Sequence, residues 1–120
     1  DPIAEISAYV RRKLELSRDY PRESRLFANE ILQGAPRIAE VIGGDLHDLV
    51  QEKAVILRHW MDEGRIARVH PVHLIFSIWA QTQHYADFGP QLQAVLGPDR
   101  DPVAEGQRFT ETLFRRMLTP

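Results

Sequence analysis

The sequence predicts an all-α protein, a bundle of five main helices in a single domain that covers residues 1–120. Apolar residues recur at helical spacing along most of the chain, and no stretch alternates apolar and polar residues as a half-buried strand would. Prolines, glycines and aspartates stand where helices would begin and end. With 43% hydrophobic and 27% charged residues, the composition is that of a folded domain.

The first two helices are predicted over residues 2–17 and 21–34. Pro2 and Pro21 stand at first helical positions, where the missing N–H costs little, and Gly34 ends the second helix. In the first helix, spacings of three and four residues place four apolar side chains on one stripe: Ile3, Ile6, Val10 and Leu14.

The middle of the chain allows two arrangements. Pro36 to Ile42 is predicted as a short helical turn, followed by a third main helix that is capped by Asp45 and ends at Gly64. Alternatively, the two pieces form one long helix that bends at Gly43 and Gly44. The sequence does not decide between them.

A fourth helix is predicted from Pro71 to about Asp87. The first half of this helix is apolar on nearly every side, so we expect it to be buried all round, either at the centre of the bundle or beneath a second subunit. A loop is predicted from Gly89 to Arg100, and Asp101 is expected to cap a last helix that starts at Pro102.

Composition and motifs exclude several functional classes. The 15 basic and 17 acidic residues give a net charge of −2, which argues against a nucleic-acid-binding surface. The lack of cysteine excludes disulfides, thiolate metal sites and a cysteine nucleophile. The sequence shows no nucleophile elbow, phosphate loop, signal peptide or apolar run near the roughly 20 residues of a membrane span. We therefore expect a cytoplasmic protein that is not an enzyme and holds no cofactor.

Metal binding is a weaker alternative. His70 and His73 are three residues apart at a helix start, and His84 and Asp87 have the same spacing. A metal site needs at least a third ligand, and no specific metal motif supplies one. Capping or surface roles are therefore favoured over a metal-dependent sensor or enzyme.

Small-molecule binding is better supported. Trp79 and Gln83 are four residues apart and share one helix face, with Phe76 and Ala86 close to it. A flat aromatic ring beside a carboxamide suits a small planar polar ligand. The alternative is that Trp79 belongs to the core and Gln83 to the surface.

The pattern of small and apolar residues in the fourth and last helices also predicts a homodimer. Gly106 and Thr110 form a strip of small residues that would let helices approach closely, and pairing with the symmetry copies would make a four-helix interface. The alternative is that both helices pack only within one subunit. The residues predicted for this interface are Ile78, Thr82, Gly106, Phe109, Thr110, Leu113 and Met117.

Several segments carry a resemblance to a known family. Residues 20–36, with Tyr20-Pro21 and Gly34-Ala35-Pro36, and residues 64–76 resemble the C-terminal domain of TetR/AcrR-family transcriptional regulators. The run from Ile78 to Gln91 is similar to the pyrimidine-utilisation regulators of that family. The resemblance covers nearly the whole chain.

The resemblance implies a ligand-sensing and dimerisation domain of a repressor. DNA would be contacted only through an N-terminal helix-turn-helix domain, which is not within these residues. A pyrimidine such as uracil is implied as the effector, with Trp79 and Gln83 at the matching positions and His84 and Tyr85 also matching. A helical dimerisation module that binds no ligand is the competing hypothesis.

Overall fold

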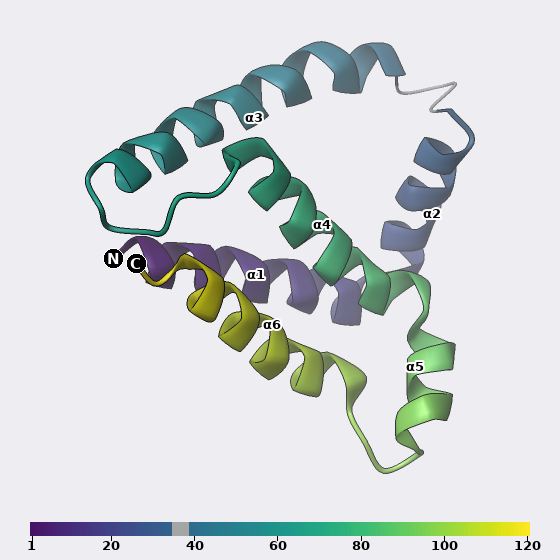
Figure 1. Ribbon diagram of the computed structural model, residues 1–120. Helices are drawn as coiled ribbons and strands as arrows, with labels where there is room; N and C mark the ends of the chain where they lie inside the picture. Colours follow the sequence, from purple (N-terminus) through teal and green to yellow (C-terminus); the bar gives the residue numbers. More distant parts are fainter. Residues whose placement is uncertain (35–38) are drawn as a thin grey trace.

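The computed structural model describes residues 1–34 and 39–120, and the side chains of residues 1–34 and 44–120. Six helices and no strand occur in these residues, so the predicted all-α class is confirmed, with one helix more than the five predicted (Figure 1). None of these helices is long and apolar enough to cross a membrane. The helices are α1 (Pro2–Asp19), α2 (Pro21–Leu32), α3 (Ala39–Asp62), α4 (Pro71–Asp87), α5 (Gly89–Leu96) and α6 (Pro102–Leu118).

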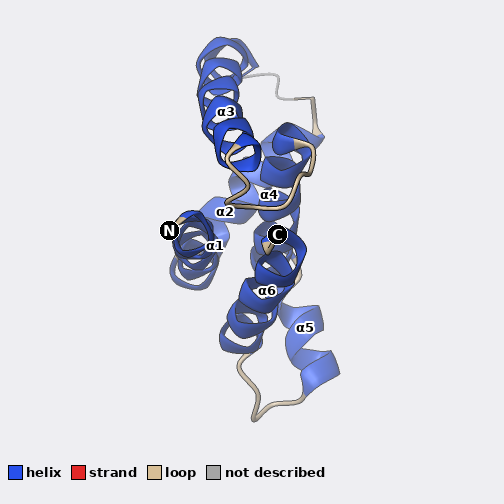
Figure 2. Cartoon of the chain, turned by 60° about the vertical axis from the view of Figure 1, so that its left-hand side comes forward, coloured by secondary structure: helices blue, strands red, loops and turns tan. Residues whose placement is uncertain are grey.

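The helices form a flat slab around α4. The molecule measures 44 × 38 × 18 Å, and because a helix with its side chains is about 10–12 Å across, the slab is less than two helices thick. Helix α4 packs against all five other helices. Figure 2 shows α1 on one side of the slab, with α4 and α5 on the other.

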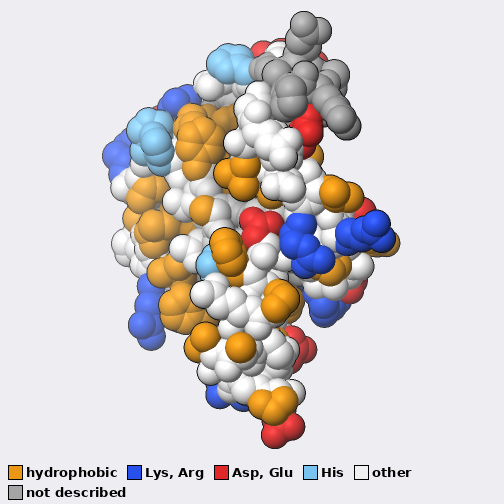
Figure 3. Space-filling model, turned by 90° about the vertical axis from the view of Figure 1, so that its right-hand side faces the viewer, with side chains coloured by type: hydrophobic (Ala, Val, Ile, Leu, Met, Phe, Trp, Pro, Cys, Tyr) orange, Lys and Arg blue, Asp and Glu red, His pale blue; other side chains and the backbone are white. Residues whose placement is uncertain are grey.

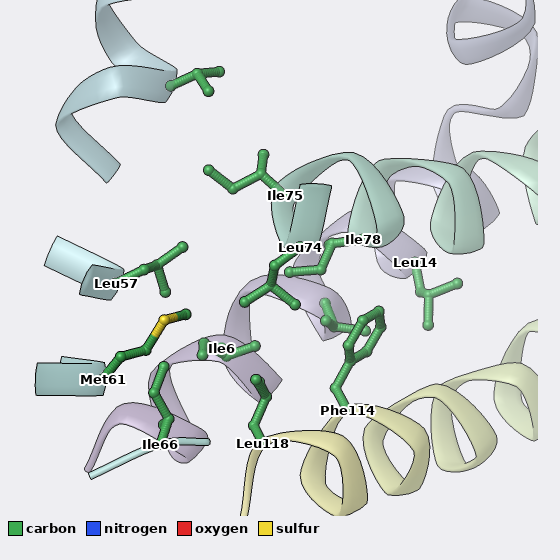
Figure 4. Packing of buried hydrophobic residues seen from close by; sticks show 12 residues of the cluster. Ile6, Leu14, Leu57, Met61, Ile66, Leu74, Ile75, Ile78, Phe114 and Leu118 are labelled. Carbon is green, nitrogen blue, oxygen red and sulfur yellow. The ribbon is translucent and has the colours of Figure 1, made fainter. Parts of the chain in front are cut away.

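The hydrophobic core lies where α1, α4 and α6 meet the end of α3. Figure 4 shows Leu14 of α1, Ile78 of α4 and Phe114 of α6 turned toward one another. Leu57 and Met61 of α3 extend the cluster toward Ile66 and Ile6. The stripe predicted for α1 is confirmed, because Ile6, Val10 and Leu14 are buried and Ile3 packs against the cluster.

Helix α3 is one continuous helix from Ala39 to Asp62 and passes through both glycines. The alternative of a single long helix is therefore the one observed, and the proposal that Asp45 caps a separate helix is wrong. The start of the predicted turn, at residues 36–38, lies outside the described residues. Gly64 follows the helix with φ +74°, which suits its predicted role as a terminator.

The predicted loop from Gly89 to Arg100 is wrong in its first half, which forms α5. Pro90, which lies within the predicted loop, stands in the first turn of α5, where proline is tolerated. The Gln93 side-chain amide donates to the carbonyls of Gly97 and Arg100, at 2.7 and 2.8 Å, and so fixes the remaining turn against the helix. Asp101 caps α6 as predicted, accepting from the Ala104 N–H at 3.2 Å.

The expectation that the first half of α4 is buried all round is only partly met. Leu74, Ile75 and Ile78 are buried, whereas Phe76 is 44% exposed and Ala80 is exposed. The slab is too thin for five neighbours to surround α4, so one side of it stays open.

Candidate functional site

An apolar cavity of about 240 Å³ lies between α1, α3 and α4. Figure 1 shows α3 set apart from α1 on this side of the molecule. Leu49 and Ile56 on its wall are 49% and 42% exposed, so the cavity opens to solvent. Its lining residues are Glu5, Ile6, Tyr9, Leu49, Val50, Lys53, Ile56, Leu57, Trp60, Ile75, Ile78 and Trp79.

A hydrogen bond between α1 and α4 fixes one wall of this cavity. The Trp79 indole N–H donates to the Tyr9 hydroxyl oxygen at 3.0 Å. The Phe76 ring lies 5.7 Å from the Trp79 ring, and the Lys13 ammonium lies 5.8 Å from the centre of the Tyr9 ring. Trp79 therefore presents an oriented aromatic surface to the cavity, as a binding site for a planar ligand requires.

Gln83 lies one turn further along α4 and does not line this cavity. Its side-chain N–H groups donate to the Ser24 carbonyl of α2 at 3.1 Å and to the Asp87 carboxylate at 3.0 Å. The structure thus places Trp79 at the cavity and Gln83 at the junction of α4 with α2. The two residues share a helix but not a cavity.

The other residues predicted to bind a ligand point elsewhere. His84 is exposed, and its ring lies 4.8 Å from that of Phe88, while Phe76 is on the open side of α4. Tyr85 packs against Gly106 of α6. Burial, and secondarily the negative charge of Glu105, raise the pKa of Tyr85 above its ordinary value. Phe76, His84 and Tyr85 therefore do not line the cavity between α1, α3 and α4.

A second cavity, of about 600 Å³, lies between α2 and the end of α4. Arg25 donates to the Ala86 carbonyl at 3.1 Å and so ties the two helices together. Figure 3 looks onto the side formed by α2 and α5 and shows basic and acidic side chains meeting beside exposed hydrophobic ones. The cavity is lined by Arg22, Arg25, Leu26, Ala28, Asn29, Leu32, Asp87 and Phe88.

The predicted interface residues divide into two sets. Ile78, Thr82, Gly106 and Thr110 are already buried inside the subunit. On α6, a second stripe with four-residue spacing is exposed: Phe109, Leu113 and Met117. Among the predicted interface residues, only those of this second stripe offer surface that another subunit could cover.

The histidines suggested as metal ligands have other contacts. His70 caps α4, because its Nδ1 accepts from the His73 N–H at 3.4 Å, and the two rings lie edge to face at 4.6 Å. Asp87, the suggested partner of His84, accepts the bond from Gln83. Within residues 1–34 and 44–120, no three histidine, aspartate or glutamate side chains converge in a way that could hold a metal ion.

The sequence matches known regulators along nearly its whole length. Residues 1–119 match the TetR C-terminal family model described as "YcdC-like protein, C-terminal region". The chain belongs to the TetR family of transcriptional regulators. Over 103 residues, 85% of this chain, it is 53% identical to the HTH-type transcriptional regulator RutR of Escherichia coli O157:H7, of E. coli K12 and of Shigella flexneri. The chain spans 49% of the length of these relatives.

In this TetR-family domain, sequence reasoning located one wall of the cavity and missed the others. The sequence pattern indicates Trp79 through its place on α4, whereas it does not indicate Tyr9, Lys53 or Trp60 as site residues. Tyr9 borders the apolar stripe of α1, and Trp60 follows the helical spacing of α3, so both resemble ordinary core residues. Their shared cavity depends on how α1 and α3 are placed in space, which helical periodicity does not report.

Proposed function

We propose that this domain is the effector-sensing and dimerisation part of a TetR-family repressor, and that its effector is a small planar molecule such as uracil. The proposal rests on the apolar cavity between α1, α3 and α4. Its two tryptophans, Trp60 and Trp79, provide flat apolar surface for a ring. A cavity of this kind, mostly apolar with a few polar groups, is the usual form of a small-molecule site.

The polar groups of the cavity suit a ring that carries carbonyl and N–H groups. The Tyr9 hydroxyl accepts from Trp79, so it can donate its own proton to a ligand carbonyl. Lys53 adds a second donor and Glu5 an acceptor. A nucleobase such as uracil carries carbonyl oxygens for these donors and N–H groups for this acceptor.

The relatives support a role in transcription. RutR is named as an HTH-type transcriptional regulator, and the match covers about half of its length. We infer that DNA is contacted by a helix-turn-helix domain elsewhere in the parent protein and that this domain contributes effector binding and pairing. The net charge of −2 fits such a division, because a DNA-binding surface is basic.

Intrinsic fluorescence tests the effector site directly, because Trp60 and Trp79 are the two tryptophans of the chain and both line the cavity. Titration with uracil should change the tryptophan emission saturably. In Trp79→Phe, with Trp60 as the remaining reporter, we expect the affinity to fall at least about tenfold, since the indole N–H and part of the ring surface are lost.

The matched control is Phe27→Leu, which removes an exposed aromatic ring of α2 that does not line the cavity, and this variant should bind uracil like the unmodified chain. If uracil, thymine and related bases leave the emission of the unmodified chain unchanged, the effector proposal is wrong. A domain that then still forms dimers would be a dimerisation module that binds none of these ligands.

We also propose that α4 and α6 form the dimer face. Both helices leave apolar side chains uncovered on the slab: Phe76 on α4 and the stripe of Phe109, Leu113 and Met117 on α6. Helices α4 and α6 also pack against each other. Two copies meeting through these surfaces would form a four-helix interface.

A further inference from the structure

The cavity between α2 and the end of α4 is lined by arginines that have no carboxylate partner. Arg22 and Arg25 both line it, and within the described part of the chain neither forms an ion pair. Their three-residue spacing places them on one face of α2. The guanidinium of Arg25 is held by α4, because it donates to the Ala86 carbonyl oxygen at 3.1 Å. Most of its N–H donors therefore remain available to another group.

Apolar side chains continue the lining of this cavity. Leu26, Leu32 and Phe88 line it and are 61%, 83% and 48% exposed. Arg22 lies in the first turn of α2 and Leu32 is its last residue, so at a rise of about 1.5 Å per residue the lining extends over about 15 Å of the helix. Figure 3 shows basic side chains beside exposed hydrophobic ones on this side of the molecule. The positive charge thus lies near the start of α2, and apolar surface extends toward its end.

The acidic residue in the lining does not cancel the positive charge. Asp87 is the one carboxylate among the lining residues, and it accepts a hydrogen bond from the Gln83 amide at 3.0 Å. Two guanidinium groups and one carboxylate leave the lining with a net charge of +1. A guanidinium can bind a carboxylate through two parallel hydrogen bonds. The cavity therefore combines groups that suit an anionic head with surface that suits an apolar body.

We propose that this cavity is a second ligand site, which binds a carboxylic acid with an aliphatic chain. The carboxylate would bind the guanidinium groups of Arg22 and Arg25, and the chain would cover Leu26 and Leu32, removing their apolar surface from water. The volume of about 600 Å³ is in the range of small-molecule sites. No residue lines both this cavity and the one between α1, α3 and α4, so the inference goes beyond the proposed function and does not depend on it.

Isothermal titration calorimetry with octanoate and octanamide tests this site. The two molecules have the same alkyl chain, but only octanoate is charged at neutral pH. We expect octanoate to bind at least about tenfold more tightly, because only it can form ion pairs with the arginines. This advantage should shrink at high salt, since Arg22 and Arg25 are exposed. Butyrate, which is charged but has a shorter chain, should bind more weakly than octanoate because it buries less apolar surface.

Two substitutions assign the charge recognition to its residues. Arg22→Met removes a cation that forms no hydrogen bond or ion pair within the described residues, so it leaves the helix packing unchanged. Arg25→Met removes the second cation together with its bond to Ala86. Each should lower the affinity for octanoate about tenfold and leave that for octanamide nearly unchanged. Arg12→Met is the matched control, because Arg12 is exposed on α1 and lines neither cavity.

The outcomes separate this site from the other cavity. If octanoate binds no more tightly than octanamide, or if the Arg22 and Arg25 variants bind octanoate like Arg12→Met, the proposal is wrong. Octanoate binding that is weakened by Trp79→Phe and not by Arg22→Met would place the acid in the other cavity, and this result would also overturn the proposal. Circular dichroism confirms that each variant is folded, and Arg22→Met remains decisive if Arg25→Met is not. The uracil titration addresses separate residues, so either proposal can fail while the other stands.

Discussion

At the contact of α4 with α6, the Tyr85 ring occupies the space that a side chain at position 106 would need. A Cβ on Gly106 would lie 2.3 Å from Cζ of Tyr85, far inside van der Waals contact. Gly106 lies inside α6, one turn after its start, and glycine is intrinsically unfavourable within a helix. Its small size therefore serves packing within the subunit, where the sequence suggested an approach between subunits.

Gly106→Ala should consequently destabilise the domain. The gain in helix propensity is outweighed by overpacking against Tyr85, and we expect the free energy of unfolding to fall by about 1–3 kcal/mol in urea denaturation. Gly44→Ala in α3 is the control, since a Cβ there meets no atom within 4 Å, and it should be neutral or slightly stabilising. Equal effects of the two substitutions would show that Tyr85 moves aside freely.

Glu105, next in sequence to Gly106, makes the stability of the fold depend on pH in the acid range. Its hydrogen bonds from Arg100, one of them 2.7 Å long, together with the charge of Arg100, hold the pKa of Glu105 below the ordinary value of 4.5. A lowered pKa in the folded state means that the contribution to stability is present above pH 4.5 and is lost as the pH falls through the folded-state pKa.

The urea midpoints of the unmodified chain and of Glu105→Gln should therefore differ near neutral pH and converge in acid. The comparison is made from neutral pH down into acid, through the range in which the carboxylate becomes protonated. A difference that stays constant over this range would mean that the ionised pair with Arg100 does not contribute. Because the pair is exposed, the difference should also shrink at high salt.

At the scale of elements, the sequence predicted a helix wherever an apolar stripe and a cap coincided. Pro71 and Asp101 begin α4 and α6 as expected. Helix α5 was missed because it is short and contains no buried residue, so it lacks a strong apolar stripe. The residues of the candidate site were also predictable only where the signal lies within one helix. Trp79 was found from its place on one helix, whereas the pairing of Tyr9 with Trp79 joins residues of α1 and α4 that are distant in sequence.

At the scale of the whole molecule, the small thickness of the slab explains why so many large apolar side chains remain exposed. A slab 18 Å thick cannot bury both sides of each helix, so α6 carries a buried stripe that ends in Phe114 and Leu118 and an exposed one that ends in Leu113 and Met117. The exposed stripe is continuous along the helix. Exposed apolar patches of this kind mark interaction surfaces in soluble proteins.

A charge in this stripe should separate the subunits of the proposed dimer. Leu113 is 37% exposed and lies between Phe109 and Met117, so Leu113→Glu would place a carboxylate in the apolar centre of the interface, where its desolvation opposes association. Light scattering coupled to size-exclusion chromatography should show a dimer for the unmodified chain and a monomer for the variant. Val95→Glu on α5, where the side chain is 79% exposed outside the stripe, should remain a dimer. If Leu113→Glu is folded and still dimeric, the subunits pair through another surface.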